Sequence, residues 1–215
     1  MSVPSQEKIA CRYCQQEQEF TLWQSINATL DPSLKDQLMS GELTTFTCQS
    51  CQKNAEVVWP LLYHDMEREL MVHIRFDEDL PDGQAREPEP VEDFMRTFTL
   101  RTVASRNELV EKVLIFEEGL DDRVIEIFKI ALRRQLEQDD QDADGELMFS
   151  ACGESEGGEK EIAFVLFKGE GEASFAVPLS VYEYFAESIR ARLPSAEAEA
   201  GRWLRVDARY AASVI

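Results

Sequence analysis

Residues 11–14 read Cys-Arg-Tyr-Cys and residues 48–51 read Cys-Gln-Ser-Cys. A two-residue spacer lets both sulfurs of one Cys-x-x-Cys turn reach one metal ion, and two such turns supply the four thiolates of a tetrahedral site. Sequence that predicts β-strands flanks both pairs, a setting typical of zinc ribbons. The chain is therefore expected to hold one structural zinc through Cys11, Cys14, Cys48 and Cys51.

Other interpretations of these cysteines stay open. Iron can replace zinc, because a tetrahedral cage of four sulfurs accepts both metals. Two redox dithiols would normally lie at helix N-termini, and neither pair begins a predicted helix. Four unligated cysteines would require two coincident spacings. The 33 residues between the pairs exceed the ~15–20 of compact sites, and a predicted strand and helix account for the excess.

The bulk charge argues against binding to nucleic acid. The chain has 215 residues, with 42 acidic and 22 basic side chains and a net charge of −20. Binding to phosphate backbones and to anionic membrane surfaces depends on lysine and arginine, so both are disfavoured. Neither a long apolar run nor a secretory signal is recognised, which predicts a cytoplasmic protein without a membrane span. Cysteine pairs in a reducing compartment are more often metal ligands than disulfides.

Two acidic stretches divide the chain into segments of ordinary composition. The first is interpreted as a linker, and the second as a linker that contains a short strand. The expected fold class is α+β, with a zinc-ribbon-like, β-rich N-terminal part, appended helices and a small C-terminal α+β segment. The expected domains are 1–136 (zinc-knuckle β part 8–76, acidic linker 77–93, strand plus two helices 94–136), the linker 137–160 and the C-terminal segment 161–215.

Helix termini are marked by capping residues. Asp31, Pro32 and Gly41 bound a short helix, and Ser105 with Glu108 forms a capping box for a second helix that ends at Gly119. A third helix is predicted over residues 121–137. It carries an apolar face, acids at its first turn and basic residues toward its C-terminal end (Lys129, Arg133, Arg134).

Strands are predicted where apolar residues alternate or a hairpin turn occurs. Residues 94–103 are expected to form a strand after the first linker. Residues 162–168 and 172–178 flank a glycine-rich turn that predicts a hairpin. A helix over 180–193 and a final strand over 202–211 would complete the chain.

Further candidate site residues are weaker. Cys152 has no histidine near it in sequence and is interpreted as a small buried hydrophobe. His64 is followed by Asp65, which can orient an imidazole, but a polar histidine at a strand entrance is favoured. The acidic turn 117–122 is interpreted as helix capping in preference to a cation site. The tryptophans are expected to be core or interface anchors (Trp23, Trp59, Trp203).

Beyond the cysteines, three stretches resemble the CpXC family of mainly bacterial proteins. They are LWQSINATLDPSLKDQLMSGELTTFTC, WPLLYHDME and IFEEGLDDRVIEIFK, and the resemblance covers roughly residues 9–136. It implies a shared fold and metal site, but no activity. Arg12 and Gln49 replace the family's usual proline, and Gln15 and Gln52 stand where glycine often follows such a turn.

The favoured function is a binding or scaffold module that recognises another protein, because no catalytic set is recognised. The acidic charge favours a basic partner. The first alternative is an enzyme with its site in a cleft between segments, which uses His64 with the carboxylates of Asp65 and Glu67. The second is acidic mimicry of nucleic acid, which rests on net charge alone. Substrate, partner identity and oligomeric state do not follow from the sequence.

Overall fold

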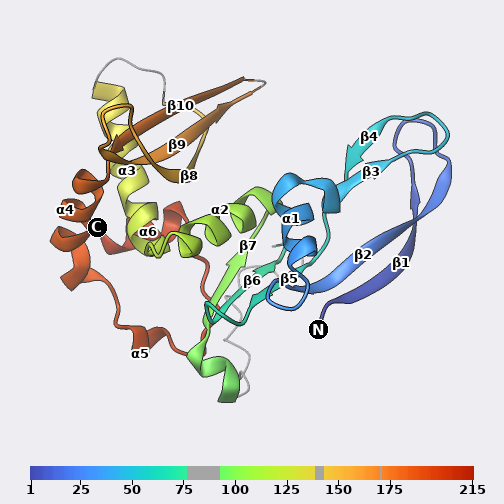
Figure 1. Cartoon of the computed structure of the whole chain (residues 1–215), viewed down its shortest axis with the longest axis horizontal. Coiled ribbons are helices and arrows are strands. Elements are labelled where there is room, and N and C mark those ends of the chain that lie inside the picture. The colour runs from blue at the N-terminus through green and yellow to red at the C-terminus, as the bar shows by residue number, and fades with distance from the viewer. Residues whose placement is uncertain (77–92, 139–142, 170) are drawn as a thin grey trace. The chain divides into compact units, whose positions relative to one another are not determined.

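A computed structural model describes residues 1–76, 93–138, 143–169 and 171–215 (Figure 1). These residues form a mixture of helices and strands, which confirms the α+β class. They group into two compact units, residues 1–110 with 200–204 and residues 111–199 with 205–215. The acidic linker predicted at 77–93 lies outside the described residues except for its last position. The predicted domain boundaries stay a prediction.

A mixed five-stranded sheet organises the first unit, with the strand order β1-β2-β5-β6-β7. The pairs β1–β2 and β5–β6 are antiparallel, and β2–β5 and β6–β7 are parallel. The interior strand β6 is buried at four of its five positions, since it has a neighbour on each side and packs on both faces. The strands are β1 (Val3–Ala10), β2 (Glu17–Asn27), β5 (Leu62–Asp65), β6 (Leu70–Ile74) and β7 (Thr99–Val103).

The helix α1 (Pro32–Ser40) follows β2 and has the predicted termini. Asp31 occupies the N-cap position, and Gly41 ends the helix at a φ of 83°, a left-handed conformation that glycine adopts without a Cβ clash. The guanidinium of Arg106 donates to the carbonyls of Leu38 and Met39 at 2.7 Å each. A cation therefore caps the last carbonyls of α1, where the helix dipole is negative.

The strand predicted over 94–103 is shorter than expected. Residues Asp93–Thr97 form a 3-10 turn, η3, and only Thr99–Val103 forms β7. The capping box before α2 (Arg106–Glu117) is confirmed in part. The Glu108 amide donates to Ser105 Oγ at 3.1 Å, but the Glu108 carboxylate accepts from Ala104 at 2.8 Å, one residue before the expected partner.

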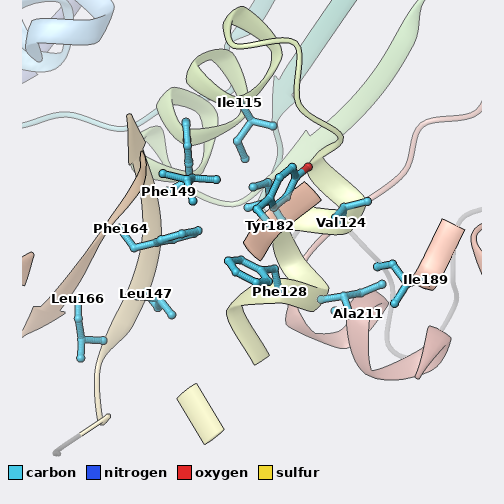
Figure 2. Packing of buried hydrophobic residues seen from close by; sticks show 13 residues of the cluster. Ile115, Val124, Phe128, Leu147, Phe149, Phe164, Leu166, Tyr182, Ile189 and Ala211 are labelled. Atoms are coloured by element: carbon cyan, nitrogen blue, oxygen red, sulfur yellow. The ribbon is translucent and has the colours of Figure 1, made fainter. Parts of the chain in front are cut away.

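An antiparallel sheet with the order β10-β9-β8 organises the second unit. Its strands are β8 (Glu146–Glu154), β9 (Lys160–Lys168) and β10 (Gly171–Pro178), so both the short strand and the hairpin are confirmed. Figure 2 shows rings from the sheet and two helices meeting, with Phe128 5.9 Å from Phe164 and 5.7 Å from Tyr182 between centroids. The helices are α3 (Asp122–Gln138), α4 (Leu179–Ile189), α5 (Ala196–Glu199) and α6 (Ala208–Val214), with a 3-10 turn η4 (Arg190–Arg192).

The final strand predicted over 202–211 is wrong. Only Leu204 makes a bridge, to Arg101, and the chain then enters α6. Asp207 explains the change, because its carboxylate accepts hydrogen bonds from the amides of Arg209 and Tyr210 at 2.9 and 3.0 Å. These bonds satisfy free amides of the first turn and start a helix where alternation of apolar residues favours a strand.

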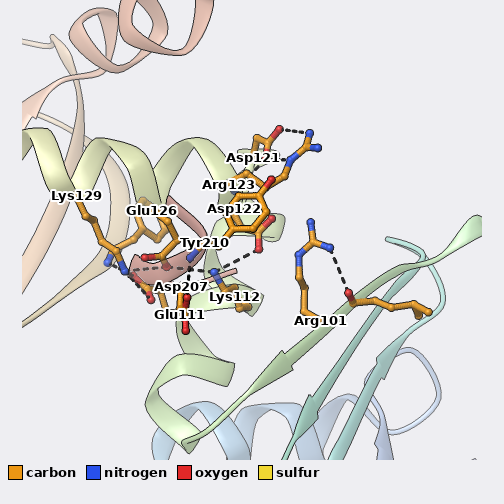
Figure 3. A network of polar contacts seen from close by, with 12 residues as sticks. Arg101, Glu111, Lys112, Asp121, Asp122, Arg123, Glu126, Lys129, Asp207 and Tyr210 are labelled. Carbon is orange, nitrogen blue, oxygen red and sulfur yellow. Dashed lines mark hydrogen bonds and ion pairs between the residues drawn. The ribbon is translucent and has the colours of Figure 1, made fainter. Parts of the chain in front are cut away.

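Five charged side chains are buried together in the second unit (Figure 3). Lys112 Nζ lies 3.3 Å from Asp122 Oδ2 and 3.2 Å from Glu126 Oε1. Lys129 Nζ lies 3.0 Å from Glu126 Oε1 and from Glu111 Oε1. Lys129 is thus an internal partner of two carboxylates, which corrects its assignment to the C-terminal end of the helix.

The buried cluster joins the helices to the sheet. Glu111 on α2 also accepts the Phe149 amide of β8 at 2.6 Å. Burial raises the pKa of Glu111, which favours its protonated form in a cluster of three carboxylates and two ammonium groups. The attraction of Asp122 and Glu126 outweighs the burial of Lys112 and raises its pKa, so this lysine stays charged.

Replacing Lys112 with methionine should lower the free energy of unfolding by about 3–5 kcal/mol, because it removes the buried ammonium group that lies within 3.3 Å of both Asp122 and Glu126. The matched control is Arg190→Met, which removes the exposed ion pair with Glu187 and should cost about 0.5 kcal/mol or less. Urea denaturation of both variants measures the difference. Equal midpoints for the two variants would show that the buried cluster does not stabilise the fold.

Candidate metal centre

The two Cys-x-x-Cys turns have the same backbone geometry. In each, the amide of the first cysteine donates to a carbonyl five residues later, at 3.0 Å in both turns (Cys11 to Gln16, Cys48 to Lys53). Its own carbonyl accepts from the amide four residues later, at 2.8 and 2.9 Å (Gln15 to Cys11, Gln52 to Cys48). The first turn follows β1, and the second joins β3 (Thr45–Thr47) to β4 (Asn54–Glu56).

A glutamine in the left-handed region closes each turn. Gln15 has a φ of 60° and Gln52 a φ of 58°, the conformation in which glycine often follows such a knuckle. The side-chain amide of Gln52 donates back to the Gln49 carbonyl at 2.8 Å, and that of Gln15 to the Arg12 carbonyl at 3.4 Å. These bonds offset part of the backbone strain, so the departure from glycine leaves the turn intact.

The two turns bring the four sulfurs together. Cys11 and Cys51 Sγ lie 3.7 Å apart, Cys14 and Cys48 Sγ lie 3.6 Å apart, and all four lie within 4.8 Å of one another. Tetrahedral bonds of about 2.3 Å to a zinc ion would place sulfurs about 3.8 Å apart. The arrangement therefore fits a metal ion. Each of the two short distances runs from a sulfur of one Cys-x-x-Cys turn to a sulfur of the other, as a site shared by both turns requires.

Backbone amides favour the thiolate at the first cysteine of each pair. The Tyr13 amide, followed by that of Cys14, lowers the pKa of Cys11 from 9.0 to about 6 in spite of burial. The amide of Cys51, followed by that of Ser50, lowers the pKa of Cys48 in spite of burial. Metal ligation needs the deprotonated sulfur, so both turns are pre-formed for it.

The pKa of Cys51, in the second turn, is shifted in the opposite direction. The Lys53 amide lowers the pKa of Cys51, but burial and the three neighbouring sulfurs outweigh it and raise this pKa to about 11. Four adjacent sulfurs cannot all carry charge without a cation among them. Ligation would remove this repulsion and deprotonate Cys51.

A small apolar cluster supports the sulfurs. Cys11, Phe46 and Cys48 are buried, and Phe20 packs edge-on against Phe46 with 5.7 Å between ring centroids. Gln18 also ties β2 to β3, since its side-chain amide donates to the Thr47 carbonyl at 3.0 Å and accepts from the Gln49 amide at 2.8 Å. Three buried residues make a small core, so the turns depend on the sulfur site for much of their cohesion.

The side-chain hydrogen bonds of the two turn glutamines and of Gln18 were not predicted from the sequence. The turn glutamines leave a signal, because the same residue follows both Cys-x-x-Cys motifs in CRYCQ and CQSCQ. The Gln18 hydrogen bonds have no such signal in the sequence. Their partners lie about thirty residues away, and the bonds form only when the β1–β2 and β3–β4 hairpins pack together.

His64 makes no hydrogen bond to Asp65 or Glu67, the two carboxylates that the enzyme hypothesis assigned to it. Its ring lies against Phe98 at 5.3 Å between centroids, and burial lowers its pKa. The Asp65 carboxylate accepts from the Glu67 amide at 3.0 Å and from the amide and guanidinium of Arg68 at 3.1 Å. Asp65 therefore holds the turn before β6, and these contacts give the enzyme hypothesis no support.

The remaining candidates have structural contacts. Cys152 is half-buried against the core of the second unit, and burial raises the pKa of its thiol, as expected for an inert side chain. In the acidic turn, Asp121 pairs with Arg123 at 2.7 Å and Asp122 with Lys112. Trp59 is buried and donates to the Trp23 carbonyl at 2.8 Å.

Comparison with known proteins supports one assignment. A family model described as CpXC protein matches residues 9–129, which is more than half of the chain and includes all four cysteines. No curated protein and no solved structure matches the chain. Within the described ranges, every helix is too short or too polar to cross a membrane.

Substitutions at Gln52 should separate backbone strain from the side-chain bond. Gln52→Ala keeps the left-handed strain but loses the bond to Gln49, and should destabilise the metal-loaded protein by about 0.5–1 kcal/mol. Gln52→Gly loses the bond but removes a strain of about 1 kcal/mol, so it should match or exceed the native stability. Thermal melting of the three proteins checks this order, and an alanine variant as stable as the glycine variant would contradict it.

Metal binding should release protons. In the reduced, metal-free protein at pH 8, the pH lies below the Cys51 pKa of about 11, so this thiol is protonated. We expect one zinc ion per chain to displace at least one proton, and affinity should fall as the pH drops because more thiols are then protonated. A pH indicator in weak buffer measures the release. Binding without proton release would show that the thiols are not the ligands.

Proposed function

The chain belongs to the CpXC protein family, and on that premise we propose that it is a binding module stapled by one structural zinc ion. Cys11, Cys14, Cys48 and Cys51 would supply the four ligands. Four thiolates complete a tetrahedron and leave no position for a substrate, which is typical of structural sites and not of catalytic ones. The observation that carries the proposal is the convergence of four sulfurs within 4.8 Å on two matched turns.

Zinc is favoured over a redox role by the position of the cysteines. Each pair lies in a turn next to a strand, and Cys11 and Cys48 are fully buried. A reactive dithiol needs an accessible, activated sulfur, usually at a helix N-terminus. Four thiols kept reduced also suit the cytoplasm, where we place the protein.

Protein recognition is favoured by the electrostatics. The net charge of −20 repels nucleic acids and would steer a basic partner toward the surface. The zinc would hold the first unit in one conformation, and a rigid binding surface loses less entropy when it binds. The zinc thereby contributes to recognition without contacting the partner.

Zinc and the four cysteines can be tested together. Protein purified under reducing conditions should contain one zinc ion per chain by elemental analysis, and Cys48→Ser should lose it. The matched control is Cys152→Ser, which changes a cysteine outside the sulfur cluster and should keep the zinc. Metal removal should unfold the first unit, since such sites contribute on the order of 10 kcal/mol in small zinc peptides. An unchanged melting curve after verified removal of the metal would contradict a structural role.

Partner binding needs a separate measurement. We expect a protein to co-purify reproducibly with the native chain and with Cys152→Ser, but not with Cys48→Ser. The interaction should weaken between low and moderate salt if a basic partner is bound. The absence of any reproducible partner with zinc-loaded protein would reject the binding role while leaving the zinc site in place.

A further inference from the structure

We propose that an extended basic peptide binds in the groove between β2 and β3, where it adds to the first unit as a strand along the open edge of β2. This proposal rests on the proposed binding function and specifies its surface. The groove lies between residues of β2 on one side and residues of α1, η1 (Glu42–Thr44) and β3 on the other, and has a volume of about 760 Å³. That is within the range of small-molecule and cofactor sites, so the groove has room for several side chains.

Along the edge of β2 that faces the groove, the backbone groups of Glu19 and Thr21 are not paired with a strand among the residues that the structure describes. The bond from the Cys11 amide to the Gln16 carbonyl fixes which residues exchange hydrogen bonds with β1, and these alternate along an antiparallel pair. The backbone groups of Glu19, Thr21 and Trp23 therefore point away from β1. The Trp23 carbonyl confirms this direction, because it accepts from the Trp59 ring in place of β1.

A proline explains why this edge stays open. β5 pairs with β2 only at Ser25–Asn27, and the parallel register would place Pro60 beside Trp23. Proline has no amide hydrogen to donate to a neighbouring strand. Pairing between β5 and β2 therefore ends there, and among the described residues no strand pairs with Glu19 and Thr21 on the edge of β2 away from β1.

The opposite wall has a matching open edge. The Val57 amide donates to the Thr44 carbonyl and the Cys48 amide to the Lys53 carbonyl, so the backbone groups of Thr45 and Thr47 face away from β4. The Gln18 side chain already donates to Thr47 and accepts from Gln49 on this edge. One amide group thus makes the pair of bonds that a neighbouring strand would make.

The lining defines the chemistry of the peptide. Phe20 lines the groove and contacts Phe46, which provides an apolar surface for every second side chain. Glu19 and Glu42 are exposed along the groove, and its lining includes no lysine, arginine or histidine. These carboxylates favour basic side chains at the alternate positions. A second copy of this chain is disfavoured, because each copy carries a net charge of −20.

The test measures binding of a capped hexapeptide of alternating lysine and valine to the zinc-loaded, full-length chain by titration calorimetry. Thr21→Pro removes one amide hydrogen from the open edge and should weaken binding about tenfold or more. The matched control is Gln6→Pro on β1. The Gln6 amide points away from β2, toward the outer edge of β1, and the native Pro4 already occupies an equivalent position of that strand. The control should bind within about twofold of the native chain. Zinc content and circular dichroism check that both variants fold.

Charge and backbone contributions are then separated. Reversal of both carboxylates, Glu19→Lys with Glu42→Lys, should abolish binding of the basic peptide and permit an analogue with glutamate in place of lysine. Of two analogues that are N-methylated on alternate residues, the one whose methyl groups face β2 should lose binding about tenfold or more. If both bind like the parent peptide, or if Thr21→Pro binds it fully, strand addition is wrong.

The two proposals fail in different ways. If the peptide does not bind the native chain, but a partner still co-purifies with zinc-loaded Thr21→Pro, the groove is not the docking surface and the binding role stands. If the native chain lacks zinc or has no reproducible partner, the proposed function itself fails. Binding of the glutamate peptide to the native chain as tightly as the lysine peptide would overturn the assignment of a basic occupant.

Discussion

The packing of the two Cys-x-x-Cys turns in the first unit is constrained by the contact of four thiol groups. Each sulfur comes from a tight turn, and the two turns lie at the ends of hairpins that share only a small apolar cluster around Phe46. Without a cation the sulfurs repel one another once they ionise, and the raised pKa of Cys51 reports that conflict. With a divalent cation the same proximity becomes the strongest local attraction. The orientation of β3 and β4 against β2 therefore depends on the charge at the centre of the cluster.

The second unit is stabilised by an apolar core and by buried ion pairs. Its core is large and apolar, with aromatic rings from α3, β9 and α4 in contact. Five charged groups are nevertheless buried beside it, and each lysine lies between carboxylates. Charges without partners would be excluded from such an interior, so the cluster restricts how α2 and α3 can pack. One unit thus gathers four sulfurs that could hold a metal ion, and the other buries ion pairs within the chain.

Local signals explain what could be predicted from sequence. The two Cys-x-x-Cys turns, the termini of α1 and the hairpin of β9 and β10 each follow from residues close in the chain. The structure confirms these elements and the clustering of the four cysteines. The helix α6 was missed because the cap at Asp207 outweighed an alternating pattern. The buried charges and the Gln18 bridge were missed for a different reason. Their partners come from separate elements, and charged residues on a helix predict exposure unless the opposing surface is known.

The separation of the two turns along the chain has a consequence for synthesis. Cys11 and Cys51, whose sulfurs lie 3.7 Å apart, are 40 residues apart in sequence. At ~5–20 residues per second, Cys11 leaves the ribosome about 2–8 s before Cys51, the last ligand. During that interval the nascent chain presents a half-site of two thiols that can bind a metal only weakly or be oxidised. The reducing power of its surroundings therefore matters most while the protein is being made.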